Sequence, residues 1–266
     1  MTRPDAFDDL ARAHPWPAEP PHPGVAPVGR PARGFELIAR ALAASETPAP
    51  VVLEIGAEFG GSTRRFLGIE GTRVVSVDPW PDWYSYRGWD TLQSFRDQPD
   101  AFYELFLTFN FEHRDRLVPI RRPSPEGLIE VHDAGLDVDL VYIDGDHRFD
   151  AVIRDLDVCH ALFPGAMLTG DDWEFTAGAK KYEGLVHPTR LAVQRWAQFR
   201  DHHVEHEANT WLIDPARPFN LEKLVPSYDV ARPRPRRKTP PPPPPRPAWR
   251  VLAGGARRRL RRLAGR

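Results

Sequence analysis

Carboxylate side chains follow three apolar runs of the sequence at the positions where the runs stop. Asp78 follows residues 73–77, Asp144 follows residues 140–143, and Asp171 and Asp172 come shortly after residues 166–168. Short apolar runs bounded in this way are typical of buried β-strands. An ionised carboxylate offers two acceptor oxygens side by side, which suits vicinal hydroxyls or hard cations. These acids can act together only if the fold brings them to one place.

Residues 139–173 predict a strand–helix–strand unit that would do so. Between the two apolar runs, residues that can be buried recur at spacings of three and four, the period of a helix with one buried face: Phe149, Val152, Ile153, Leu156, Cys159, His160 and Phe163. A parallel crossover places the carboxyl ends of both strands at one edge of the sheet, where open α/β folds bind ligands. We therefore expect the carboxylates of Asp144, Asp171 and Asp172 to meet at that edge.

A second candidate binding element lies earlier in the chain. Residues 51–55 form a buried-strand run that leads at once into a glycine-bearing turn from Gly56 to Thr63, and a helix follows. The backbone of such a turn can approach a ligand closely, and the helix N-terminus favours polar or anionic groups. Asp78 lies 24 residues after Glu54, close to the spacing at which nucleotide-binding sheets place a carboxylate on ribose hydroxyls.

The order of expected elements predicts an α/β fold. Strands are expected over residues 51–55, 73–77, 117–120, 140–143 and 166–168, with a last pair at 204 and 210–213. Helical segments alternate with the first five strands. The most economical arrangement is a Rossmann-like, seven-stranded, mostly parallel sheet in the order 3-2-1-4-5-7-6, with one antiparallel strand and helices on both faces.

Proline divides the chain into a core and two tails. Eight prolines fall between Pro4 and Pro31, and nine more fall between Pro233 and Pro247. Neither stretch has apolar periodicity, so both are expected to be disordered or polyproline segments. We therefore predict a flexible segment over residues 1–32, a single domain over residues 33–225, and a proline-rich basic tail over residues 226–266, disordered or ending in an amphipathic helix.

Charge is distributed unevenly along the chain. Residues 231–266 contain thirteen Lys or Arg and no acid, which leaves a net charge of −14 for residues 1–230. Such a core is unsuited to phosphate-backbone binding, so no specific nucleic-acid partner is expected, whereas the tail could contact an anionic surface or a membrane. The single cysteine, Cys159, indicates a reducing compartment and is expected to be buried. With no signal peptide and no apolar run near 18 residues, we expect a soluble, cytoplasmic protein.

Four motifs in correct order resemble those of the class I S-adenosylmethionine (SAM)-dependent methyltransferases. They read VLEIGAEFGGST, VVSVDPW, DLVYIDGDHRF and GAMLTGDDW. Within that superfamily they are most similar to metal-dependent O-methyltransferases that act on small molecules, in particular macrolide-type sugars, and to the related cephalosporin-pathway enzyme. The resemblance covers about residues 35–214. It implies an O-methyltransferase that uses SAM and a divalent cation, most readily Mg²⁺, on a small-molecule or sugar hydroxyl.

The resemblance also implies roles for individual residues. Glu54, Gly56 and Gly60 would line the methionine part of the cofactor, with Ser62 at the start of the helix beneath it. Asp78 would hold the ribose, Ser124 would lie near the adenine, and Asp144 would border both cofactor and metal. Asp144, Asp171 and Asp172 would bind the cation, in agreement with the preference of Mg²⁺ for oxygen ligands.

His147 is the candidate general base for the transfer. It stands three residues after Asp144, where catechol-type relatives carry a lysine, and a neutral imidazole can accept a proton near pH 7. The alternative is that His147 caps the following helix or orients Asp144. A cation that chelates two vicinal oxygens would lower the pKa of the attacking hydroxyl and fix its geometry.

Two other functional classes fit parts of the sequence. A nicotinamide-dependent oxidoreductase could use a similar sheet, but the turn has glycines in the pattern Gly-x-x-x-Gly, and that chemistry gives no reason for Asp171 and Asp172. A non-catalytic scaffold acting through the basic tail is the other alternative, and the intact acids argue against it. The aromatic loop from Trp80 to Trp89 suits stacking on a sugar or a planar ring, and the alternative is that its side chains only cover the core. The sequence is compatible with a homo-oligomer as well as with a monomer.

Overall fold

The computed structural model describes residues 5–29, 34–45, 47–81, 90–174 and 185–215. These residues belong to the unit Met1–Tyr228. The strands are β1 (Val51–Ile55), β2 (Arg73–Val77), β3 (Leu117–Ile120), β4 (Leu140–Ile143), β5 (Met167–Gly170), β6 (Glu205–Glu207) and β7 (Thr210–Ile213). The α-helices are α1 (Ala6–Ala13), α2 (Phe35–Ala44), α3 (Gly61–Leu67), α4 (Ala101–Asn110), α5 (Glu126–Asp133), α6 (Phe149–Leu162) and α7 (Pro188–Phe199), and 3₁₀ helices cover Asp90–Phe95 and Phe111–Arg116.

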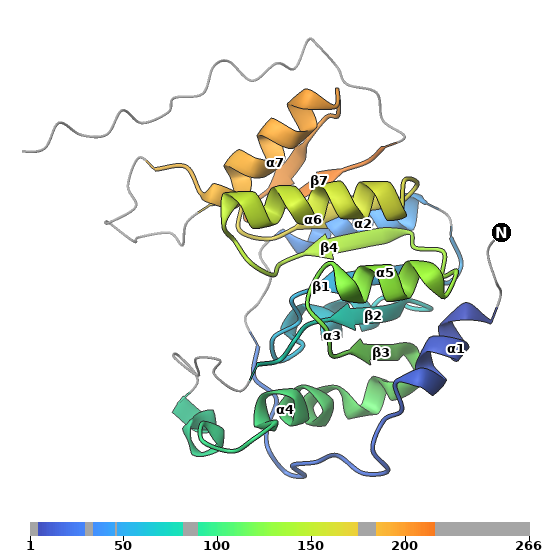
Figure 1. The fold of residues 1–266 in the computed structure, drawn as a ribbon, viewed down its shortest axis with the longest axis vertical. Coiled ribbons are helices and arrows are strands. Elements are labelled where there is room, and N and C mark those ends of the chain that lie inside the picture. Colours follow the sequence, from blue (N-terminus) through green and yellow to red (C-terminus); the bar gives the residue numbers. More distant parts are fainter. Residues whose placement is uncertain (1–4, 30–33, 46, 82–89, 175–184, 216–266) are drawn as a thin grey trace, which may run out of the picture. The chain divides into compact units, whose positions relative to one another are not determined.

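The strands form one seven-stranded sheet in the order β3-β2-β1-β4-β5-β7-β6. β1 to β5 are mutually parallel, and β7 runs antiparallel to both β5 and β6. The predicted fold class, strand order and antiparallel strand are therefore confirmed (Figure 1). All five parallel strands end at the same edge, so the residues that follow them share one side of the molecule.

Two hydrophobic layers hold the helices against the sheet. β1 shows why both faces are covered, because all five of its residues are buried, as expected for a central parallel strand. Leu53 and Ile55 point toward one layer, which also contains buried residues of α1, α5, α6 and α7. Val52 points toward the other, which contains buried residues of α2, α3 and α4. Cys159 of α6 is buried in the first layer, as predicted.

The N-terminal segment corrects the expectation of an unfolded stretch over residues 1–32. Phe7 and Leu10 of α1 are buried in the same layer as α5, and α1 contacts β3 (Figure 1). The indole of Trp16 then donates to the Leu117 carbonyl at 2.9 Å, and His22 Nε2 lies 2.9 Å from Glu104 Oε2. The prediction of disorder from composition was wrong because a few large apolar side chains, spaced along a proline-rich segment, are enough to hold it against the edge of the sheet.

For Trp80, the structure decides between the two roles considered for the aromatic loop. Its side chain is fully buried, its ring packs against Phe106 with centroids 4.6 Å apart, and its Nε1 donates to the Glu58 carbonyl at 2.8 Å. Trp80 is therefore a core residue and presents no ring for stacking on a substrate. The rest of the aromatic loop, residues 82–89, lies outside the described part of the chain. No helix of the described residues is long and apolar enough to cross a membrane.

Candidate active site

A cavity of about 690 Å³ lies at the carboxyl edge of the sheet, within the usual range of about 300–1,000 Å³ for small-molecule sites. Segments that follow each of β1 to β5 contribute to its lining, and α6 adds Arg154 and Asp155. The predicted residues that line it are Gly56, Ser62, Asp78, Ser124, Asp144, His147, Asp171 and Asp172. The fold thus brings nearly the whole predicted site to one cavity.

The turn after β1 depends on Gly56. The residue has a φ of +83°, and a Cβ atom there would lie 2.3 Å from the Asp144 carbonyl oxygen. Only glycine combines this backbone conformation with so close an approach. The close contact brings the glycine turn next to the end of β4, so Gly56 and Asp144 are neighbours in the lining of the cavity.

Glu54 and Gly60 do not line the cavity, contrary to the expectation. The Glu54 side chain is fully buried, and its oxygens accept from Ser62 Oγ and Thr63 Oγ1 at 2.5 Å and from Ser76 Oγ at 2.7 Å. Burial raises the pKa of Glu54, and the three hydroxyl donors oppose that shift. Glu54 therefore links the start of α3 to the sheet through buried hydrogen bonds.

Gly60 is required for packing. Its φ is +77°, and a Cβ atom would lie 2.2 Å from Nδ2 of Asn110 in α4. The sequence pattern could not separate Glu54 and Gly60 from lining positions, because supporting and lining residues are neighbours in β1 and in the turn that follows it.

Asp78 holds neighbouring backbone N–H groups and also lines the cavity. Its Oδ2 accepts the backbone N–H groups of Ala57 and Glu58 at 2.9 and 3.1 Å, and its Oδ1 accepts that of Trp80 at 2.7 Å. Burial raises its pKa, and these backbone donors oppose the rise. A carboxylate has about four acceptor positions, so capacity for a ligand hydroxyl is left.

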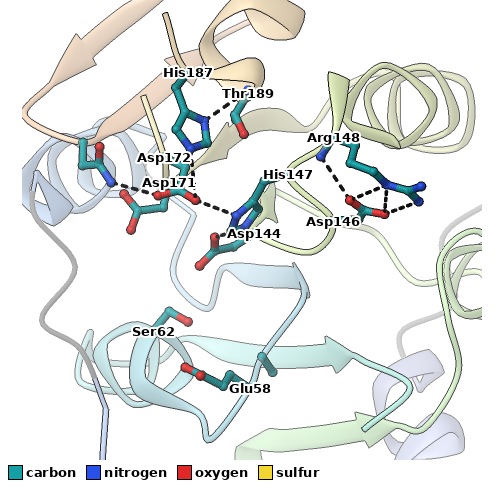
Figure 2. Close-up of polar contacts among 12 residues, drawn as sticks. Glu58, Ser62, Asp144, Asp146, His147, Arg148, Asp171, Asp172, His187 and Thr189 are labelled. Carbon is teal, nitrogen blue, oxygen red and sulfur yellow. Dashed lines mark hydrogen bonds and ion pairs between the residues drawn. The ribbon is translucent and has the colours of Figure 1, made fainter. Parts of the chain in front are cut away.

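Asp144, His147 and Asp172 form the polar cluster at the other end of the cavity (Figure 2). His147 Nδ1 lies 2.7 Å from Asp172 Oδ2, and His147 Nε2 lies 3.3 Å from Asp144 Oδ1. Asn209 Nδ2 donates to the other oxygen of Asp172 at 3.3 Å. One imidazole therefore bridges two carboxylates that come from the ends of neighbouring parallel strands.

The electrostatics of this cluster follow from the bridging imidazole. Burial alone would lower the pKa of His147, but the hydrogen bonds to Asp144 and Asp172 outweigh it and raise the pKa to about 10. Burial would raise the pKa of Asp172, but its bond to His147 leaves that pKa below the ordinary value. For Asp144, burial prevails over the bond from His147 and raises the pKa to about 7. His147 and Asp172 thus form an ion pair, and His147 donates protons to both neighbours.

This arrangement differs from the expected metal set. The group whose ligand atoms lie within 4.8 Å of one another is Asp144, His147 and Asp172, with His147 in the place expected for Asp171. Asp171 still lines the cavity, and its Oδ1 is buried with no hydrogen-bond partner within the described residues. Burial raises the pKa of Asp171 to about 6.

These residues fit a divalent cation. One ligand atom each of Asp144, His147 and Asp172 lie within 4.8 Å of one another, and Oδ1 of Asp171 has no hydrogen-bond partner among the described residues, a lack that a positive charge would compensate. A nitrogen from His147 would widen the choice of ion toward Mn²⁺, Fe²⁺ or Zn²⁺.

Two residues at the site were missed by sequence reasoning. His187 precedes α7, accepts the Thr189 N–H at its Nδ1 (3.3 Å), and places Nε2 3.9 Å from Asp172 Oδ2 (Figure 2). Asp155 of α6 lines the cavity and accepts from Ser124 Oγ at 2.7 Å. A signal for Asp155 was present, because an acid at this position interrupts the apolar face of the predicted helix.

The similarity of this chain to known proteins bears on the function of the cavity. Residues 53–173, from β1 to just past β5, match the model of a protein family described as a methyltransferase domain. This segment is a methyltransferase domain. The predicted class I methyltransferase is confirmed at that level, since the strand order and the family match agree.

Solved structures similar to the chain include several methyltransferases. One is TomG from Streptomyces achromogenes, an O-methyltransferase of tomaymycin synthesis in complex with SAM (16% identity, TM-score 0.44, 80% of this chain and 91% of that chain covered). Another is an O-methyltransferase from Bacillus cereus in complex with S-adenosylhomocysteine (15%, 0.41, 80% and 91%). A third is CalS11, a TDP-rhamnose 3′-O-methyltransferase of calicheamicin biosynthesis (13%, 0.45, 68% and 79%). Among curated proteins, none matches the sequence.

Proposed function

We propose that this methyltransferase domain transfers a methyl group from SAM to a hydroxyl group, with the help of a divalent cation. The acceptor would be a vicinal diol, such as a sugar or another small molecule with two adjacent oxygens. Methyl transfer needs an oxygen nucleophile in line with the sulfonium methyl group. Holding the two reactants in that geometry can contribute the equivalent of about 7–11 kcal/mol to the barrier reduction.

One observation carries this proposal: a single cavity holds both the glycine turn with Asp78 and the cluster Asp144–His147–Asp172. The first group offers acceptor oxygens and close backbone approach for a nucleoside. The second offers carboxylates that can hold a cation and, through it, an acceptor with adjacent oxygens. A dehydrogenase would have no use for the second group at that place.

The residues of the chain would divide the work as follows. Gly56 leaves room for the cofactor, Asp78 would accept from its ribose hydroxyls, and Asp144 and Asp172 would hold the cation, which would lower the pKa of the acceptor hydroxyl. His147 lies between these carboxylates and would take the hydroxyl proton.

His147 cannot act as a base while both of its nitrogens donate to carboxylates. If Asp144 and Asp172 instead direct their oxygens to a cation, the interactions that raise the pKa of His147 to about 10 are lost. Burial and the positive charge of the cation then both disfavour the protonated ring, so the pKa falls to or below its ordinary value near 6.5, where a neutral ring can accept a proton. Cation binding would therefore also prepare the base.

Calorimetry and a methyl-transfer screen on the full chain test the proposal. S-adenosylhomocysteine should give heat of binding and NAD⁺ should not. Labelled SAM should modify vicinal diols but not the matched monodeoxy compounds, and a chelator should stop the transfer until Mg²⁺ or Mn²⁺ is restored. Binding of NAD⁺ in place of S-adenosylhomocysteine would overturn the methyltransferase assignment. Transfer that is insensitive to the chelator would remove the cation from it.

A further inference from the structure

Asn209, in the turn between β6 and β7, is bonded to the segment that follows β5. Its carbonyl oxygen accepts the Trp173 N–H at 2.9 Å, and its Oδ1 accepts the Glu174 N–H at 2.8 Å. Its Nδ2 donates to Asp172 Oδ1 at 3.3 Å. A residue outside the cavity lining therefore connects the β6–β7 hairpin to one carboxylate of the cluster Asp144–His147–Asp172.

Both ends of the Asn209 amide are used, and this decides its orientation. The reverse orientation would set the amide nitrogen against the Glu174 N–H and the amide oxygen against the Asp172 carboxylate, two repulsive contacts. Burial raises the pKa of Asp171, and a hydrogen bond from Asn209 is among the interactions that oppose the rise. The amide nitrogen is thus the end that serves the two consecutive acids.

The backbone of Asp172 needs such support. Its φ is +60°, in the left-handed region, which is costly for residues with a Cβ atom even though Asp tolerates it better than most. A conformation of this kind persists where the surrounding contacts hold it. The bonds from Asn209 to Trp173 and Glu174 hold the backbone directly after Asp172. In this conformation Asp172 Oδ2 lies 2.7 Å from His147 Nδ1.

We propose that Asn209 is a positioning residue that biases the cation site toward Mg²⁺ and against Ca²⁺. Its donor bond to Oδ1 fixes the rotation of the Asp172 carboxylate, and its bonds to the following backbone fix the place of that carboxylate. This inference rests on the proposed function, since it takes the cluster to hold a divalent cation.

The two ions differ in how much freedom of the ligands they tolerate. Mg²⁺ demands a near-ideal octahedral geometry at about 2.0–2.1 Å, whereas Ca²⁺ takes oxygens at about 2.3–2.6 Å in flexible arrangements. A carboxylate that can neither rotate nor shift favours the ion with the stricter geometry. A carboxylate that is free to move can adapt to the larger ion. Asn209 would therefore influence the choice of ion without contacting it.

Calorimetric titration of the full chain with Mg²⁺ and with Ca²⁺ tests the proposal through the ratio of the two affinities. Asn209→Asp is nearly isosteric: an oxygen can still accept the Glu174 N–H, but the donor to Asp172 becomes an oxygen that repels it. The added charge attracts both divalent ions to a similar extent, so it largely cancels in the ratio. The ratio of Mg²⁺ to Ca²⁺ affinity should fall by about fivefold or more. The affinity for S-adenosylhomocysteine should stay that of the wild type.

Two further variants separate positioning from stability. Asn209→Ala removes the donor and the side-chain acceptor without adding charge, and it should lower the ratio in the same direction. Leu212→Ala is the control, because Leu212 lies buried in β7 of the same hairpin. This change should lower the free energy of unfolding in urea and leave the ratio of affinities unchanged.

The outcomes separate this inference from the function on which it rests. If the wild type binds neither ion, the cation of the proposed function fails and the inference fails with it, whereas binding of S-adenosylhomocysteine would still support the methyltransferase. If the wild type binds the ions and both Asn209 variants keep its ratio, the cation site stands and Asn209 does not bias it. An equal fall of the ratio in Leu212→Ala would also overturn the inference, because any loosening of the hairpin would then have the same effect.

Discussion

His147 Nδ1 lies 2.7 Å from Asp172 Oδ2, although α6 and β5 separate the two residues in the sequence. The same ring reaches Asp144 Oδ1 with its other nitrogen at 3.3 Å (Figure 2). The imidazole thus occupies the space between the two carboxylates that would hold a cation. His147 and a cation would compete for the same oxygens of Asp144 and Asp172. The titration of His147 and the affinity for a cation both depend on that competition.

The first prediction concerns the titration of His147 in chelator-treated protein. Its ring resonances in NMR spectra should titrate near pH 10, and in Asp172→Asn they should titrate at a distinctly lower pH. Because the folded-state pKa lies above the unfolded one, the ion pair stabilises the fold fully below about pH 6.5. That contribution should disappear as the pH rises through about 10. A ring that titrates near pH 6.5 in the wild type would contradict the ion pair.

Cation binding provides the second prediction. Mn²⁺ affinity, measured by calorimetry and by the electron paramagnetic resonance signal of the bound ion, should fall at least tenfold in Asp144→Asn and in Asp172→Asn. Each change removes a charged oxygen from the cluster. Asp146→Asn is the control, because the Asp146 carboxylate is paired with Arg148 and lies outside the cluster. Equal losses in all three variants would indicate a general charge effect and not a defined site.

Gly56→Ala should disrupt the contact between the glycine turn and the end of β4. The new Cβ atom would lie 2.3 Å from the Asp144 carbonyl oxygen at a φ of +83°, so the free energy of unfolding should fall by about 1–3 kcal/mol or more. Binding of S-adenosylhomocysteine should weaken as well. Gly165→Ala is the control, since a Cβ atom there meets nothing within 4 Å. Chemical denaturation of both variants makes the comparison.

The N-terminal helix gives the fourth prediction. Phe7→Ala should reduce the free energy of unfolding by about 3–5 kcal/mol, because the ring is buried against the sheet. Phe199→Ala removes the same side chain from a position that is 85% exposed and should change stability by no more than about 0.5 kcal/mol. A small effect of Phe7→Ala in urea denaturation would mean that α1 is not part of the stable core.

The sequence alone determined the sheet and the general location of the site. β1 to β5 could be predicted because parallel strands buried on both faces are continuous apolar runs, and this periodicity is local information. The positions of Asp78, Asp144 and Asp172 followed, since an acid just after a parallel strand always reaches the carboxyl edge. The N-terminal segment could not be predicted, because α1 packs against β3 and Trp16 donates to Leu117 of β3, partners that lie far away in the sequence.

Only the tertiary structure decided which side chains face the cavity and what they contact. Glu54 has the same sequence context as a lining residue, yet the hydroxyls of Ser62, Thr63 and Ser76 surround it in the core. His147, and not Asp171, completes the cluster, because side-chain direction depends on packing around loops that carry no periodic signal. The pairing of Ser124 with Asp155 likewise joins two segments whose contact exists only when α5 and α6 lie side by side on the sheet.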